Sequence, residues 1–156
     1  MRFLGELSSE LICIAPPWRS FADTVAGLVD TLVAAHQLPA GSEGSAVQAV
    51  TTRESEASTA FLDIHAGVPH ARLPGLTRAL VALAVSAAGL YEAVPTVPIQ
   101  IVALVLSPPG AVTGHLDTLA GIATLLRSAE LRADLLTAID GAAALRALQH
   151  HARSMP

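Results

Sequence analysis

Six histidines are the side chains of this sequence best suited to chemistry near neutral pH. His65 and His70 occupy a segment that contains Gly and Pro, and His115 lies close to the expected start of a helix. Polar residues on loops that a rigid scaffold holds often serve a binding or catalytic site. The other three lie at expected helix C-terminal ends, where the helix dipole favours a partly protonated imidazole: His36, His150 and His151.

His70 has the features of a nucleophile for phosphoryl transfer. It follows Pro69, whose fixed φ stiffens the approaching chain and whose missing N–H removes a competing donor. A neutral imidazole has one unprotonated nitrogen, and a hydrogen bond to the other nitrogen decides which of the two attacks. We therefore take His70 as the candidate residue that accepts a phosphoryl group.

His115 and three further residues could stabilise the negative charge of a phosphoryl group. Thr113 is the expected N-cap of a helix, which places His115 at the second helical position among N–H groups that lack an intrahelical acceptor. Such a helix start attracts a phosphoryl group, and a histidine there can donate to its oxygens. Arg53 and Arg72 add fixed positive charge with bidentate geometry. For Arg53 the alternative is an ordinary ion pair with a neighbour such as Glu54 or Glu56.

A metal site is the alternative interpretation of His65, His70 and His115. Open zinc sites with three His ligands exist, but nothing in this spacing demands one. Cys13 is the only cysteine, which excludes an intramolecular disulfide and a thiolate zinc cluster. We expect Cys13 to be a small buried residue near an early strand.

The elements that position these residues follow from the hydrophobic pattern. Near-continuous apolar runs at 79–85 and 97–106 indicate strands covered on both faces, and 59–75 indicates short strand plus loop. Helices are expected after five caps: Ser20, Ser42, Thr113, Ser128 and Asp140. This order predicts an α/β fold with one mixed sheet sandwiched by helices, in a single domain at 1–156 with its core at about 11–148 and a polar tail at 149–156.

Composition and charge exclude several classes of function. Of the 156 residues, 52% are hydrophobic and 14% charged, the net charge is −4, and lysine is absent, so the basic footprint of a nucleic-acid-binding protein is missing. The stretch 79–114 has one charged residue, Glu92, but Gly and Pro cut it into runs shorter than the roughly 20 residues of a membrane span. The start has no long apolar run, so we expect a cytoplasmic protein that does not span a membrane.

The ordered set of motifs resembles the phosphotransferase-system EIIA domains of the fructose, mannitol and nitrogen-regulatory type, the type 2 EIIA domains. The residues that carry the likeness are Arg53-Glu54, Ser58-Thr59, Gly67-Val68-Pro69-His70-Ala71-Arg72, the strand that ends at Pro108, and His115-Leu116. It runs from about Leu11 to Leu148. The sequence departs from the family before and around His70. Residues 62–65 replace its usual Gly-x-Gly, and the spacing from Arg53 to His70 is longer by one residue. Gly67 stands where the family usually has Ala, and Ala71 where it has Gly.

The resemblance implies a cytoplasmic domain whose Pro-His histidine, His70, takes a phosphoryl group from an HPr-like phosphocarrier protein and passes it to an EIIB-type sugar-transport component. The second active-site histidine of the family maps to His115 and its arginine to Arg53. That scheme needs no metal and no organic cofactor. The changed loop before His70 favours the alternative, an EIIA-like regulatory module that binds a transporter or enzyme without relaying phosphate.

Overall fold

Two buried strands, β5 (Leu80–Val85) and β8 (Ile101–Ser107), form the centre of the sheet in the computed structural model, which describes residues 1–155. They pair antiparallel over six residue pairs. Apart from Ser107 their side chains are all apolar, as expected for strands that helices cover on both faces. The predicted buried sheet centre is therefore confirmed.

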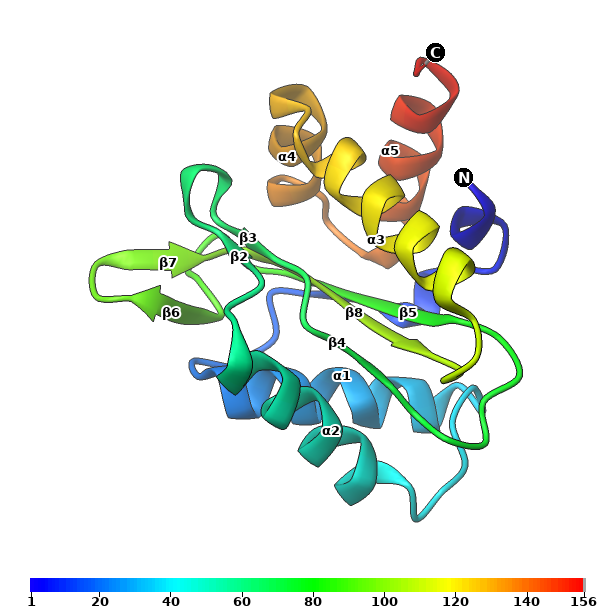
Figure 1. Ribbon diagram of the computed structural model, residues 1–156. Helices are drawn as coiled ribbons and strands as arrows, with labels where there is room; N and C mark the ends of the chain where they lie inside the picture. Colours follow the sequence, from blue (N-terminus) through cyan, green and yellow to red (C-terminus); the bar gives the residue numbers. More distant parts are fainter. Residues whose placement is uncertain (156) are drawn as a thin grey trace.

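The second apolar run is not one strand, as predicted for 97–106, because it divides at Gln100. Its first part, β7 (Val97–Ile99), pairs with β6 (Tyr91–Val94) in a separate two-stranded hairpin. Pro98 lacks the N–H that a central strand would need, which favours this position outside the main sheet. The hairpin extends away from the helical layers in Figure 1.

Four short strands complete a mixed sheet in the order β1-β5-β8-β3-β2, with β4 also paired to β8. They are β1 (Ile12–Ile14), β2 (Ala60–Phe61), β3 (Ala66–Gly67) and β4 (His70–Arg72). Strand β1 runs parallel to β5, and β3 and β4 run parallel to β8. Cys13 lies in β1 and is half-buried, with its Sγ 3.3 Å from the Thr31 hydroxyl oxygen.

Helices cover both faces of the sheet (Figure 1). Helices α1 (Phe21–Ala34) and α2 (Glu43–Glu56) lie on one face. Helices α3 (Val112–Leu126), α4 (Ala129–Leu136) and α5 (Gly141–Arg153) lie on the other. The predicted α/β sandwich is confirmed, whereas the polar tail expected at 149–156 is helical as far as Arg153. Within residues 1–155 no helix has the length and hydrophobicity that a membrane crossing requires.

Three of the predicted caps accept a hydrogen bond from a backbone N–H of the first helical turn, at 2.8–3.2 Å: Ser20, Ser128 and Asp140. Ser42 occupies the N-cap position of α2, but its hydroxyl donates to the carbonyl of Pro39 instead of capping the helix. The chain therefore enters α2 through a turn that the serine closes.

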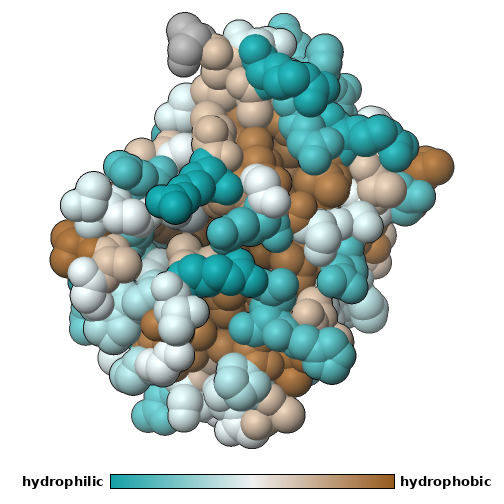
Figure 2. All heavy atoms as spheres, turned by 90° about the vertical axis from the view of Figure 1, so that its right-hand side faces the viewer, coloured by the Kyte–Doolittle hydropathy of each residue, from teal (hydrophilic) through white to brown (hydrophobic). Residues whose placement is uncertain are grey.

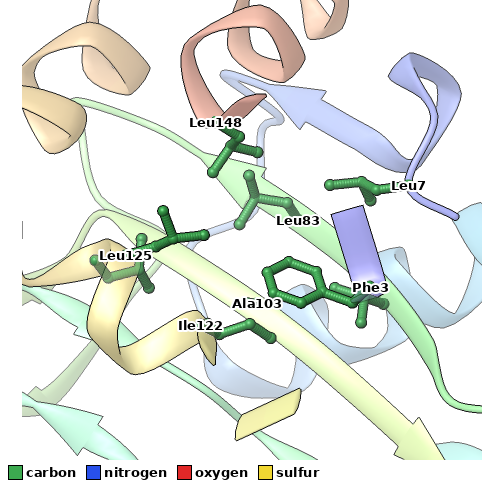
Figure 3. A pocket seen from close by; sticks show the side chains of 9 residues that line it. Phe3, Leu7, Leu83, Ala103, Ile122, Leu125 and Leu148 are labelled. Carbon is green, nitrogen blue, oxygen red and sulfur yellow. The ribbon is translucent and has the colours of Figure 1, made fainter. Parts of the chain in front are cut away.

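The N-terminal 3-10 turn η1 (Arg2–Gly5) covers the space between the sheet and helices α3 and α5. Figure 3 shows Phe3 directed into a space bounded by Leu83 of β5, Ile122 of α3 and Leu148 of α5. A gap of about 20 Å³ remains, and its lining is apolar. It offers a water molecule no polar partner, so we expect it to be dry.

Replacing Leu125 with Ala should lower the free energy of unfolding by about 2–5 kcal/mol, because the deleted side chain is fully buried beside this gap. Urea denaturation measures the loss. Leu116 lies on the same helix but is 57% exposed, so Leu116→Ala is the matched control and should change stability by no more than about 0.5 kcal/mol. Equal losses for the two variants would contradict this assignment of the buried face of α3.

Candidate functional site

His70 and His115 come from different elements and face each other beside β8. Their ring centroids are 5.2 Å apart, and the ring planes meet at 60°. His70 is the first residue of β4 and is half-buried, whereas His115 lies near the start of α3 and is only 5% exposed. The two histidines singled out in the sequence are thus close enough to contact one small group between them.

The backbone before His70 fixes the orientation of its ring. Strand β4 pairs with β8 so that His70 lies opposite Val105, whose N–H donates to the carbonyl of Pro69 at 3.0 Å. The Nδ1 atom of His70 lies 2.8 Å from the carbonyl oxygen of Val68. Because a carbonyl can only accept, Nδ1 carries a proton, and Nε2 holds the free lone pair when the ring is neutral.

Ser107, the last residue of β8, fixes the ring of His115. Its hydroxyl oxygen lies 2.7 Å from Nδ1 of His115, and both residues are buried. A hydroxyl can donate or accept, so this contact is compatible with either tautomer. When Ser107 donates, the single proton of a neutral His115 lies on Nε2, where it can be donated to an anion.

Burial lowers the pKa of His115 below its ordinary value of 6.5, and positive charge at His70, Arg72 and Arg53 lowers it further. His115 is therefore neutral at pH 7. A neutral ring keeps one N–H for donation while it leaves the other nitrogen to Ser107.

The positive charges of Arg53 and Arg72 act on His115, and their guanidinium groups donate hydrogen bonds to backbone carbonyls. Nη1 of Arg53 lies 3.4 Å from the carbonyl oxygen of Ala57, and Nη1 of Arg72 lies 2.9 Å from that of Pro109. Among residues 1–155 neither arginine forms a salt bridge, so the alternative ion pair of Arg53 with Glu54 does not form. Both charges remain available to an anion.

The prediction that Thr113 caps the helix before His115 is wrong. Helix α3 begins at Val112 with Ala111 in the N-cap position. His115 is therefore the fourth helical residue, not the second, and its N–H donates to the carbonyl of Ala111 at 2.9 Å. The turn that follows Ser107 starts the helix earlier than expected, because the N–H of Ala111 donates to the carbonyl of Pro108.

Thr113 is an exposed first-turn residue whose N–H has no partner within the helix.

His70 opens onto a hollow of about 220 Å³ whose lining is mainly apolar. The other lining residues are Ser58, Thr59, Ala60, Phe61, Val68 and Leu119. The Glu54 carboxylate fixes the loop here by accepting from the N–H of Thr59 at 2.9 Å and from its hydroxyl at 2.6 Å. Figure 2, which looks at the edge where β8 ends and α3 begins, shows hydrophobic surface interrupted by hydrophilic groups.

The loop before His70 is anchored to the residue that follows α3. Residues Leu62–Ile64 form the 3-10 turn η3, and Nη1 of Arg127 lies 2.6 Å from the Asp63 carboxylate. The same guanidinium lies 5.2 Å from the ring centroid of Phe61. This segment before His70 is therefore held by side-chain contacts of Arg127.

His65 does not join the other two histidines. Its backbone is left-handed, with φ of 54°, and its Nδ1 lies 2.8 Å from the carbonyl oxygen of Pro98. Residues 1–155 contain no group of three or more His, Cys, Asp or Glu side chains that could hold a metal ion. The geometry therefore does not support the three-histidine alternative.

Two groups of this site have no signal in the sequence. Nothing in the neighbours of Ser107 marks it as the partner of His115. The Val68 carbonyl is a backbone group that every residue possesses, so no residue type could signal it. Only the path of β3 and β4 along β8 shows its role.

The sequence of this chain matches that of a known protein family. Residues 7–151 match the model of the EIIA 2 family of the phosphoenolpyruvate-dependent sugar phosphotransferase system. A fructose-specific EIIA component of Haloferax volcanii is 28% identical over 130 residues, which cover 83% of this chain and 82% of that protein.

Two solved structures share the fold. The nitrogen regulatory protein IIA-Ntr of Neisseria meningitidis superposes with a TM-score of 0.81 at 20% identity, over 95% of this chain and 99% of that one. The Escherichia coli mannitol enzyme IIA, solved in complex with phosphorylated mannitol enzyme IIB, gives 0.71 at 16% identity, over 92% and 97%.

The NMR titration of His115 should have a midpoint below 6.5, because burial and nearby positive charge favour the neutral ring. Protonating a ring whose pKa is lowered by folding disfavours the folded state. The contribution of His115 to stability is therefore complete above pH 6.5 and decreases as the pH falls below that value.

Urea denaturation at pH 7.5 and pH 5 measures this effect. His115→Asn should lose less stability over that interval than the wild type, and His150→Asn, which alters an exposed histidine of α5, should behave like the wild type. A midpoint at or above 6.5 would contradict the assignment of a neutral, buried His115.

Proposed function

We propose, from the premise that this chain belongs to the EIIA 2 family of the phosphoenolpyruvate-dependent sugar phosphotransferase system, that His70 carries a phosphoryl group between a phosphocarrier protein and an EIIB-type component. The observation that carries the proposal is the pairing of His70, whose Nδ1 is held by a carbonyl, with His115 at 5.2 Å. The related mannitol enzyme IIA, which was solved with phosphorylated enzyme IIB, supports the choice of partner.

In the proposed reaction Nε2 of His70 attacks the phosphorus atom of the phosphohistidine of the carrier. A phosphorus–nitrogen bond forms on Nε2 as the bond to the donor imidazole breaks, and the donor nitrogen keeps the electron pair. The proton on Nδ1 of His70 stays in its hydrogen bond to Val68, so positive charge on the ring has an acceptor at 2.8 Å. The second transfer reverses these steps toward a nucleophile of the EIIB-type partner.

Charge stabilisation comes from groups around the two rings. His115 donates from Nε2 to a phosphoryl oxygen while Ser107 holds its other nitrogen. Arg53 and Arg72 balance the negative charge, and the unpaired N–H groups in the first turn of α3, that of Thr113 included, present a positive helix end. Catalysis of this kind is mostly positioning and electrostatics, so it needs no cofactor.

The surroundings of His70 favour relay over the regulatory alternative. A regulatory module without relay would be expected to have His70 packed under Leu62 or Ile64. Instead Leu62 is 41% exposed and His70 lines the open hollow described above. Val112 and Leu116 beside His115 are also exposed, and they add an apolar rim for successive protein partners.

The test is incubation of the purified chain with phosphoenolpyruvate, the phosphocarrier protein and its kinase. One acid-labile phosphate per chain should appear, and His70→Ala should abolish it. His115→Asn should slow its formation about 10²–10³-fold, the effect of removing one preorganised donor to a developing anion.

His150→Ala is the matched control, because His150 is exposed and lies on α5, away from the pair. It should be labelled at the wild-type rate. No label on the wild-type chain, or undiminished label on His70→Ala, would overturn the proposed function.

A further inference from the structure

We infer that Tyr91 is a positioning residue for His70 and acts through Gly67 and Val68. The inference rests on the proposed function and adds a residue that no motif of the sequence indicated. Tyr91 belongs to β6, outside the main sheet, and is 7% exposed. Its hydroxyl oxygen is the one buried side-chain nitrogen or oxygen atom in residues 1–155 without a hydrogen-bond partner.

The Tyr91 hydroxyl occupies the space of the side chain that residue 67 lacks. A Cβ built on Gly67 would overlap this oxygen, whereas the next nearest atoms, on Ile99 and on the Tyr91 ring, would lie at an ordinary 3.6 Å. The backbone of Gly67 is not among the positive-φ conformations of the chain, so its geometry admits a side chain. The hydroxyl is therefore the single steric obstacle to alanine here.

The ring of Tyr91 is itself held in place. It meets Phe21 of α1 edge to face, with the ring centroids 5.2 Å apart. Helix α1 thus contacts the ring of Tyr91, and the hydroxyl of that ring lies against Gly67. The contact with Phe21 therefore restricts the movement of the Tyr91 ring and of its hydroxyl.

From Gly67 the constraint reaches His70 through adjacent residues. Gly67 pairs with Val102 of β8, and the next residue, Val68, donates its N–H to the carbonyl of Thr59 at 3.2 Å. The Val68 carbonyl then accepts from Nδ1 of His70. Packing against Gly67 thus limits the freedom of the chain one residue before the carbonyl that orients the imidazole.

An unpartnered buried hydroxyl is unfavourable for folding, and local conflicts of this kind are expected mainly at functional sites. Burial, and then the nearby charge of Glu54, raises the pKa of Tyr91 far above its ordinary value of 10, so the group stays a neutral hydroxyl. If Tyr91 served stability alone, phenylalanine would be the better residue. The hydroxyl instead fills, from another strand, the space that a side chain on Gly67 would occupy.

The experiment removes the hydroxyl of Tyr91, adds a methyl group at Gly67, and combines the two changes. The variants are Tyr91→Phe, Gly67→Ala and the double variant, with Val94→Ala, an exposed residue of the same hairpin, as the matched control. The readouts are the thermal midpoint, the ¹⁵N chemical shifts that report the His70 tautomer, and kcat and KM for phosphoryl transfer from the carrier.

Tyr91→Phe should keep or raise the thermal midpoint, yet lower kcat about tenfold at unchanged KM and reduce the Nδ1–H tautomer of His70. Gly67→Ala should lower both the midpoint and kcat, because the added methyl meets the hydroxyl. In the double variant the methyl fills the vacated space, so kcat and the tautomer should return to within about twofold of wild type. Val94→Ala should match the wild type in all three readouts.

Unchanged kcat and tautomer in Tyr91→Phe would overturn the inference, as would a double variant no better than Gly67→Ala. If the wild type accepts no phosphoryl group, the proposed function fails, but the tautomer measurement still tests the positioning role. A tautomer shift in Tyr91→Phe that the double variant reverses would support it even then, and an absent shift would overturn it.

Discussion

The hydrogen bond from Nδ1 of His70 to the carbonyl of Val68 is the interaction on which the account of the site depends. It holds the proton on Nδ1 and leaves the lone pair of the neutral ring on Nε2, so the two nitrogens of the imidazole are no longer equivalent. Pro69, which connects the two residues, restricts the backbone between donor and acceptor. Tyr91, which packs on Gly67, and Glu54, which accepts from Thr59, both restrict the chain around this hydrogen bond.

The buried pair of central strands explains why both histidines meet at one place. Strand β8 pairs on one side with β5 and on the other with β4, which begins at His70. The same strand ends at Ser107 and, after a turn, leads into α3 with His115. One strand therefore positions His70, which is the proposed nucleophile, together with His115 and the Ser107 hydroxyl that contacts it. Its residues are all buried and, apart from Ser107, apolar, which gives the groups that it positions a well-packed support.

Sequence reasoning found those parts of this arrangement that local patterns encode. The apolar runs of β5 and β8 and the caps of α1, α4 and α5 are local, and the Pro-His motif identified His70 with the aid of a family resemblance. The start of α3 was misplaced because the turn geometry after Ser107, not the type of residue at 113, decides where the helix begins. The Val68 carbonyl, the Ser107 contact and the packing of Tyr91 on Gly67 join segments distant in sequence or use backbone atoms, so no local pattern could have indicated them.

The proposed relay depends on Nε2 of His70 as the nitrogen that takes the phosphoryl group. Phosphorus–nitrogen correlation NMR of the ¹⁵N-labelled, phosphorylated chain tests it directly, because the coupling identifies the bonded nitrogen. We expect phosphorus bonded to Nε2 of His70, with a proton still on Nδ1. Phosphorus bonded to Nδ1 would contradict it, because the Val68 carbonyl would then have lost its donor, and so would phosphorus on any other residue.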